Sequence, residues 1–583
     1  MDIEKAIRDI HDGDADQLEF IFSDNDKIIV TAPAGCGKTT AMVSKIAWEL
    51  CSGLIPNNKK VLAMTFSVNA AIRIKNSVKL LLPNLTENPK SLLRRIDIAN
   101  YHNFAMRLLY KYGHLLSEDL ANLSEFKILD DKAATNLLPE EEKNRFSELQ
   151  EHLINIDYVS LHASIESYWM TLKNDLIPQK YITYNGILVG AIKLLQLDSF
   201  KKFYRNYYQM IIIDEFQDTN LLGYMLAECL ISTNKAIFLG DDVQQIYGFL
   251  GAIDDALGRV SIKYNAKQIS FKTNYRFKNN GRMMNTDLLV RWYAEYYNPC
   301  STNAAILIKE LESDIQEVEF ISQGIKRIVD TNDSVAVLVR AGWQGNIIVN
   351  KLEKDNIPFF NALYSEQDTE YMNFYKIAIE EFHKCVSGKA VQRSLNKCLA
   401  AVKARESEVY TSSDKKYIFD SLYELMKTLF EISRTWEGNP KERYVDLDFC
   451  LGNNGLKHMM EYINEKVILT TIHSSKGLEW DYVIIPQMNA CVFPSWNHVC
   501  KKCRSVQGFN INNNECVCTF APEMAKKWKE ELNAFYVSIT RAKKDVFLTA
   551  NIGPNQNGYR KQTNCMVNLP GLIKVNYDWD TYI

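Results

Sequence analysis

A glycine-rich segment near the N-terminus combines residue types that bind phosphate. Residues 32–39, APAGCGKT, lie between an apolar run at 27–32 and a stretch near 38–51 with helical spacing. In a strand–loop–helix of this kind, backbone N–H groups and the helix N-terminus surround phosphate oxygens. Lys38 would reach the β- and γ-phosphates, and Thr39 would hold Mg²⁺. Ala32 stands where the general pattern has Gly, so a chance turn is the alternative for the motif taken alone.

Two adjacent carboxylates follow a second apolar run, in IIIDEFQD. The run predicts a buried strand, and Asp214 and Glu215 would emerge at its carboxyl end. Asp214 can bind Mg²⁺ through water, and Glu215 can polarise the water that attacks a γ-phosphate. Acidic pairs are common in loops, but beside a phosphate-binding loop this pair predicts a nucleotide hydrolase. A kinase or a GTPase stays open here, although the sequence has no guanine-reading N-K-x-D segment.

Short apolar runs elsewhere predict the elements that position these residues. Further strands are expected at 60–66, 209–214, 235–240 and 267–272, and a second group at 334–340, 467–472, 482–486 and 545–550. Strands that alternate with helical patterns predict parallel α/β sheets. Residues 103–190 and 366–465 instead lack strand runs and have helical spacing. We therefore expect an α/β protein with two parallel-sheet cores, each interrupted by a mainly helical insertion.

The composition is that of an ordinary globular protein. The chain has 583 residues, 24% charged and 46% apolar, with a net charge of −3, which excludes collagenous, low-complexity and disordered classes. At about 150 residues per domain the length suggests roughly four domains. The sequence shows neither a signal-peptide pattern nor a long uninterrupted apolar run, so we expect a soluble, cytoplasmic protein without a membrane partner. The 13 cysteines are expected to be mostly reduced thiols.

Further motifs follow in an order that resembles the UvrD/Rep/PcrA kind of superfamily 1 DNA helicase. The segments that carry the resemblance are TFSVNAA (65–71), NYHNFA (100–105), DEFQDTN (214–220), GDDVQQIYGFLGA (240–252), TNYR (273–276), TTIHSSKGLEWD (470–481) and FYVSITRAKK (535–544). The resemblance implies two RecA-like motor domains. The first would comprise 1–102 and 191–300 with a helical insertion at 103–190, and the second 301–365 and 466–583 with a helical insertion at 366–465.

The resemblance also implies how ATP is bound and hydrolysed. Gln17 would read adenine, Tyr275 would stack on it and Glu479 would contact the ribose. Gln244 would sense the γ-phosphate, and Arg276 and Arg541 would supply guanidinium groups to it, one from each side of the cleft between the motor domains. The expected catalytic residues are Lys38, Asp214, Glu215, Gln244, Arg276 and Arg541, and the expected loop contacts are Ala32, Pro33, Ala34, Gly35, Cys36, Gly37, Lys38, Thr39 and Thr40.

For DNA, the resemblance implies stacking and backbone contacts. Phe66 and Phe249 would stack on bases, which tolerates any sequence, while Thr65, His102 and His473 would lie near the strand backbone. Without the resemblance, phenylalanines such as Phe66 and Phe249 are more often core aromatics, and a histidine such as His102 is more often a buried histidine with its hydrogen bonds satisfied. These contacts discriminate weakly between DNA and RNA.

Two departures from the family pattern bear on the function. Thr40 replaces an arginine that stacks on adenine in the family. Gly248 and Leu250 replace arginines in the segment at 240–252, which we call the coupling segment because it would link ATP hydrolysis to movement on DNA. We expect an ATP- and Mg²⁺-dependent 3′→5′ helicase that acts on single-stranded or tailed duplex DNA and has a nuclease or repair protein as a partner. The alternative is a DNA-sensing ATPase that regulates a nuclease, as in some phage-defence systems, with little unwinding of its own.

A cysteine cluster lies between the last two motifs. Cys500, Cys503, Cys516 and Cys518 fall within 498–518, and paired thiolates of this kind suit a tetrahedral structural Zn²⁺. The second pair is C-x-C rather than C-x2-C, so a set of free thiols in an exposed insertion is the alternative.

Overall fold

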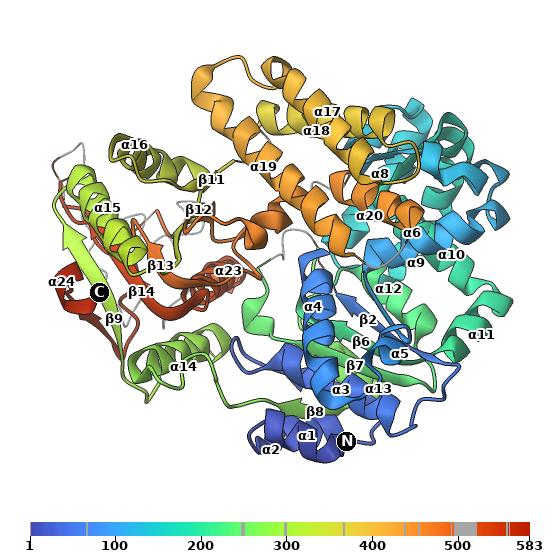
Figure 1. The fold of residues 1–583 in the computed structure, drawn as a ribbon, viewed down its shortest axis with the longest axis horizontal. Coiled ribbons are helices and arrows are strands. Elements are labelled where there is room, and N and C mark those ends of the chain that lie inside the picture. The colour runs from blue at the N-terminus through green and yellow to red at the C-terminus, as the bar shows by residue number, and fades with distance from the viewer. Residues whose placement is uncertain are drawn as a thin grey trace. The chain divides into compact units, whose positions relative to one another are not determined.

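The chain folds into two compact units, Met1–Thr273 and Asn274–Ile583, each built around a parallel sheet (Figure 1). The computed structural model describes all residues except 1, 66–67, 247–250, 297–299, 365–367, 437–438, 453–454, 491, 495–521, 555–557 and 559. The predicted α/β class with two parallel-sheet cores is confirmed. Residues 274–300, grouped with the first core in the sequence, belong to the second compact unit, and the subdomain bounds stay predictions.

The first unit contains a six-stranded sheet in the order β3-β2-β6-β7-β1-β8, parallel throughout. Its inner strands are buried along nearly their whole length, as expected for a parallel sheet covered on both faces. Thr65 pairs with Asn100 and with Asp214, so the ends of three strands meet at one edge. The strands are β1 (Lys27–Thr31), β2 (Lys60–Thr65), β3 (Ile96–Asn100), β6 (Tyr208–Asp214), β7 (Lys235–Gly240) and β8 (Lys267–Ser270).

Helices cover this sheet and form the insertion after β3. Helix α3 packs against α2 and α4, and α10 packs against α6 and α12. The helices are α1 (Ile3–Ile10), α2 (Ala15–Phe22), α3 (Lys38–Cys51), α4 (Val68–Leu85), α5 (Pro89–Leu93), α6 (Tyr101–Tyr112), α7 (Asp131–Thr135), α8 (Glu140–Ile154), α9 (Tyr158–Thr171), α10 (Tyr184–Gln196), α11 (Asp198–Tyr207), α12 (Leu221–Leu230) and α13 (Ala256–Tyr264).

The expectation that 103–190 lacks strands is wrong in one detail. Strands β4 (Lys127–Leu129) and β5 (Tyr181–Thr183) pair in parallel inside the insertion. Each has three residues, too few to leave an apolar run in the sequence. The segment is otherwise helical, as predicted.

The second unit contains a seven-stranded sheet in the order β11-β12-β10-β13-β14-β9-β15, again parallel in every pair. Val339 pairs with Thr471, so the segments that follow β10 and β12 begin side by side. The strands are β9 (Ala304–Leu311), β10 (Val335–Val339), β11 (Phe360–Ala362), β12 (Val467–Thr471), β13 (Trp480–Ile485), β14 (Ala542–Asn551) and β15 (Leu572–Val575).

The second unit's insertion is helical, and α17 packs against α18, α19 and α20 (Figure 1). The helices of this unit are α14 (Gly281–Tyr296), α15 (Asp314–Asp330), α16 (Asn346–Lys354), α17 (Thr369–Cys385), α18 (Gln392–Ala404), α19 (Lys416–Ile432), α20 (Pro440–Gly452), α23 (Pro522–Ile539) and α24 (Trp579–Tyr582). Within the described parts of both units, no helix has the length and apolar character needed to cross a membrane.

Candidate functional site

The glycine-rich loop connects β1 to α3 at the carboxyl edge of the first sheet. Its backbone is anchored where Ala32 N donates to Gly240 O of β7 at 3.1 Å. Gly35 and Gly37 have φ of 81° and 73°, values that only glycine adopts without strain. Helix α3 begins at Lys38 with Gly37 as its N-cap, and no side chain caps it. The N–H groups of this helix end therefore suit an anion, to which the helix dipole adds attraction.

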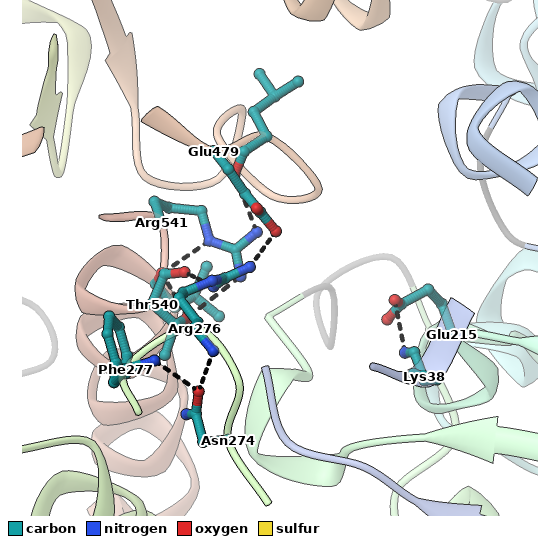
Figure 2. Close-up of polar contacts among 10 residues, drawn as sticks. Lys38, Glu215, Asn274, Arg276, Phe277, Glu479, Thr540 and Arg541 are labelled. Atoms are coloured by element: carbon teal, nitrogen blue, oxygen red, sulfur yellow. Dashed lines mark hydrogen bonds and ion pairs between the residues drawn. The ribbon is translucent and has the colours of Figure 1, made fainter. Parts of the chain in front are cut away.

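Lys38 contacts both carboxylates that follow β6. Its Nζ lies 2.7 Å from Glu215 Oε1 (Figure 2) and 3.2 Å from Asp214 Oδ1. Burial lowers the pKa of Lys38, but the charges of Asp214 and Glu215 outweigh it and raise that pKa. Burial raises the pKa of Asp214, and the charge of Lys38 opposes this. The sequence separates the lysine from the carboxylates by more than 170 residues, and the parallel sheet brings them together.

Glu215 is held in an uncommon backbone conformation by its neighbours. Its φ is 53°, in the left-handed region that costs a non-glycine residue about 1 kcal/mol or more. Its N–H donates to Asp214 Oδ1 at 3.0 Å, and Gln217 Nε2 donates to its Oε2 at 2.6 Å. Strain of this kind persists only where the surrounding structure imposes it, and it is found preferentially at functional sites.

A chain of hydrogen bonds continues from Glu215 to Gln244. Gln217 is fully buried, and its Oε1 accepts from Asp241 N at 3.1 Å. Asp241 Oδ2 in turn accepts from Gln244 Nε2 at 2.7 Å. Gln244 was among the predicted site residues, whereas Gln217 and Asp241 were not, although they lie inside the DEFQD and GDD motifs.

Gln17 lies directly against the loop. It is 2% exposed, and its Nε2 donates to Cys36 O at 2.9 Å. A Cβ on Gly37 would lie 2.7 Å from Gln17 Nε2, so a side chain at this position would force the Gln17 amide to shift. That Gln17 reads adenine stays a prediction, as does the effect of Thr40, which lies half-buried in the first turn of α3.

These groups fit a magnesium nucleotide. Cationic and N–H donors from Lys38 and the start of α3 suit the phosphates, while Asp214, Glu215 and the Thr39 hydroxyl are oxygen ligands of the type that Mg²⁺ prefers. Among the described residues, no group of three or more His, Cys, Asp or Glu side chains could hold a metal ion. Mg²⁺ in nucleotide sites is commonly held by one or two protein oxygens together with substrate phosphates.

In the second unit, Arg276 contacts Glu479 and the backbone of Thr540. Its guanidinium forms an ion pair with the Glu479 carboxylate and donates to Thr540 O (Figure 2). Asn274 holds the backbone on which Arg276 lies, because its Oδ1 accepts from Arg276 N at 3.0 Å and from Phe277 N at 3.2 Å. The fold thus joins two residues that are 203 positions apart.

Arg541 is close to this pair and is buried. It is 4% exposed and donates to Val537 O at 3.0 Å, Leu478 O at 3.2 Å and Thr540 Oγ1 at 3.2 Å. Thr540 therefore contacts both arginines, one through its carbonyl and one through its hydroxyl. Arg276, Glu479 and Arg541 all belong to the second unit, and Tyr275, beside Arg276, has Lys278 Nζ 5.9 Å from its ring centre.

The predicted DNA contacts are only partly within the described residues. Thr65 is fully buried at the end of β2, and its Oγ1 has no hydrogen-bond partner among the residues that the structure describes. Burial lowers the pKa of His102 to about 4, and its ring lies edge-on to Tyr184. Burial, with help from the charge of Arg340, lowers the pKa of His473 to about 4. Outside the described residues lie Phe66, Gly248, Phe249, Leu250, Cys500, Cys503, Cys516 and Cys518.

A glycine-rich loop between a parallel strand and a helix, with carboxylates at the end of a neighbouring strand, defines the class of P-loop nucleotide-binding proteins. The family models match in two places. The UvrD/REP helicase N-terminal domain matches residues 14–174 and 159–265, and the UvrD-like helicase C-terminal domain matches residues 364–552. The chain belongs to the UvrD/Rep family of superfamily 1 helicases.

Curated relatives match over most of the chain. A probable DNA helicase II homolog of Mycoplasma genitalium is 22% identical over 91% of this chain and 84% of its own length. A probable DNA helicase II homolog of Mycoplasma capricolum is 24% identical over 91% of this chain and 83% of its own. DNA helicase II of Rickettsia typhi is 23% identical over 93% of this chain and 92% of its own.

Proposed function

We propose that the protein is an ATP- and Mg²⁺-dependent DNA helicase that moves 3′→5′ along single-stranded DNA. The observation that carries the proposal is the cluster of Lys38, Asp214 and Glu215 at the phosphate loop. Membership of the UvrD/Rep family and the printed names of the relatives support DNA as the substrate.

In this proposal the first unit performs the chemistry on the γ-phosphate. Bound nucleotide attracts Lys38 Nζ away from Glu215, because the phosphate oxygens offer it a stronger partner. Glu215 is then able to accept a proton from the attacking water, while Gln217 keeps hold of its other carboxylate oxygen. Bound Mg²⁺ would supply charge neutralisation for the phosphates, with Thr39 and Asp214 as its protein contacts.

The chain from Glu215 through Gln217 and Asp241 to Gln244 gives the nucleotide state a route to the next segment. A change at Glu215 alters the hydrogen bonding of Gln217 and thereby the turn that contains Gln244. Residues 247–250 follow directly and include the predicted base-stacking Phe249. We propose that this sequence of contacts couples hydrolysis to movement on the strand.

The second unit contributes the guanidinium groups. Arg276 is paired with Glu479, and Arg541 donates to backbone carbonyls. For either arginine to contact phosphate, it exchanges these partners for phosphate oxygens, and Glu479 becomes available to the ribose. Arginines that stabilise a transferring phosphoryl group contribute about 10³–10⁵ in rate.

A DNA-sensing ATPase that regulates a partner nuclease is the second candidate. Leu250 favours it, because a cation that the family has in the segment linking hydrolysis to movement is missing there. Such a protein would hydrolyse ATP on DNA without separating strands.

Strand displacement tests the two candidates. Purified protein is mixed with ATP, Mg²⁺ and duplexes that carry either a 3′ or a 5′ single-stranded tail, beside a Lys38→Ala variant. Unwinding of the 3′-tailed duplex alone, lost in the variant, is expected for the helicase. DNA-stimulated hydrolysis without unwinding would favour the regulatory ATPase, and unwinding from a 5′ tail would contradict the proposed polarity.

A further inference from the structure

A histidine outside the family motifs connects to the phosphate loop through buried hydrogen bonds. His11 follows α1 and is 2% exposed. Its Nδ1 contacts Gln17 Oε1, and its Nε2 lies 2.8 Å from Ser44 Oγ. Ser44 is fully buried on α3, the helix that begins at the loop. Gln17 in turn connects His11 to the phosphate loop, because its Nε2 donates a hydrogen bond to Cys36 O.

The hydrogen-bond partners of Gln17 and His11 determine which of their atoms donate and which accept. Gln17 Nε2 must face Cys36 O, because an amide oxygen there would meet another acceptor. Gln17 Oε1 therefore faces His11, and Nδ1 must carry the proton that it accepts. His11 Nε2 is then the acceptor for the Ser44 hydroxyl. Burial lowers the pKa of His11, which favours the neutral ring that this pattern requires.

We propose that His11 is a positioning residue that, through Gln17, holds the phosphate loop in its phosphate-binding conformation. The terminal amide of glutamine rotates readily, so Gln17 needs a second partner to keep Nε2 directed at Cys36 O. His11 supplies that partner and is itself fixed by Ser44. The loop is thus tied at Cys36 to its own helix at Ser44, through a segment that precedes both in the chain.

The proposal rests on the proposed nucleotide binding at this loop and concerns phosphate rather than the base. Gln17 Oε1 keeps a second lone pair and Nε2 a second hydrogen, which a contact with adenine would use. The hydrogen bonds of Gln17 to Cys36 and to His11 hold the loop. A loop held in this way binds any ligand with a polyphosphate chain more tightly than a loop without these bonds, whether or not the ligand carries a base. This distinguishes the positioning role from base recognition.

Three substitutions of His11 separate the two sides of the ring. His11→Asn retains an N–H donor at the distance of Nδ1, whereas His11→Gln extends its amide towards the position of Nε2. His11→Phe keeps the ring and removes both polar atoms. Binding is measured with a fluorescent ATP analogue, and magnesium tripolyphosphate, which lacks a base, is the competitor.

We expect His11→Gln and His11→Phe to weaken both ligands by the same factor, about fivefold to tenfold, as for the loss of one buried hydrogen bond. His11→Asn is expected to stay within about threefold of wild type. In the double variant His11→Phe with Gln17→Leu, binding is expected to equal that of Gln17→Leu alone, because the histidine acts through the glutamine. Should His11→Phe fail to fold, the comparison of His11→Gln with His11→Asn decides the question.

Two results would overturn the proposal. One is wild-type affinity for both ligands in His11→Gln. The other is weaker binding of the ATP analogue with unchanged tripolyphosphate binding, which would assign His11 to recognition of the base. If wild type and Lys38→Ala both fail to bind the analogue, the proposed function fails as well, an outcome distinct from the other two.

Discussion

Removing the amino group of Lys38 should destabilise the first unit even without nucleotide. Lys38 is the cation between Asp214 and Glu215, at 3.2 and 2.7 Å, and the Asp214 side chain is only 5% exposed. Breaking a buried ion pair by removing one partner costs about 3–5 kcal/mol. Because the Glu215 side chain is 27% exposed and is partly stabilised by water, we expect the low end, about 3 kcal/mol. For a unit that spans Met1–Thr273, that lowers the melting temperature by about 5 °C.

Thermal unfolding of Lys38→Met, followed by calorimetry without ligands, measures this effect. Lys267→Met is the matched control, since Lys267 and Glu19 form an ion pair of 3.0 Å with both side chains about half exposed, where less than about 1 kcal/mol is expected. Adding Asp214→Asn to Lys38→Met should recover about half of the loss, and adding Glu215→Gln should recover less. A melting temperature for Lys38→Met no lower than that of Lys267→Met would refute the reasoning.

The same variant should show a defined pH dependence. Burial raises the pKa of Asp214, and losing the opposing charge of Lys38 raises it further. Asp214 in the folded variant then binds a proton more readily than Asp214 in the unfolded chain does. The stability of the folded variant therefore falls as pH rises from the pKa of Asp214 in the unfolded chain to its raised pKa in the folded protein. The difference in melting temperature between wild type and Lys38→Met should therefore narrow from pH 8 towards pH 5.

Three further substitutions test other parts of the site. Gln217→Leu removes the donor to Glu215 Oε2 and should lower ATP turnover by about 10²-fold at nearly unchanged nucleotide affinity; steady-state kinetics would contradict this if only KM changed. In Arg541→Lys, a single amino group cannot take the place of the three guanidinium nitrogens that donate hydrogen bonds. We expect ATP turnover to fall by about 10³-fold, and turnover near that of wild type would remove Arg541 from the catalytic residues. Thr65→Val deletes a buried hydroxyl without a described partner. We expect an unchanged or higher melting temperature and weaker stimulation of ATP hydrolysis by DNA. A lower melting temperature would show that the hydroxyl is structurally required.

Most strands of the two sheets and the phosphate loop could be predicted from the sequence, although β3 and the eight-residue β9 were missed. The run MIII at residues 210–213 is apolar at every position because parallel strands are buried on both faces, and the structure has β6 there. Parallel pairing brings the carboxyl ends of strands to one edge, so the neighbourhood of Lys38, Asp214 and Glu215 followed from the motifs. Strands β11 and β15 left no such signal, since the first has three residues and the second is largely exposed.

The connections between motifs could not be predicted. The contact of Gln217 with Asp241 depends on how two loops follow β6 and β7, and the circuit of His11, Gln17 and Ser44 on how α1 and α2 pack beside α3. The pairing of Arg276 with Glu479 depends on the path of the chain after Thr273, which enters the second unit earlier than the sequence pattern indicated. Each is a tertiary contact between polar groups, for which apolar periodicity gives no information.

Hydrolysis of ATP with and without single-stranded DNA tests the central claim most directly. Wild-type protein with Mg²⁺ is expected to hydrolyse ATP slowly alone and many times faster with DNA, and Lys38→Ala is expected to abolish both rates. Hydrolysis that DNA leaves unchanged, in folded protein that binds ATP, would contradict the account of this chain as a DNA-driven motor.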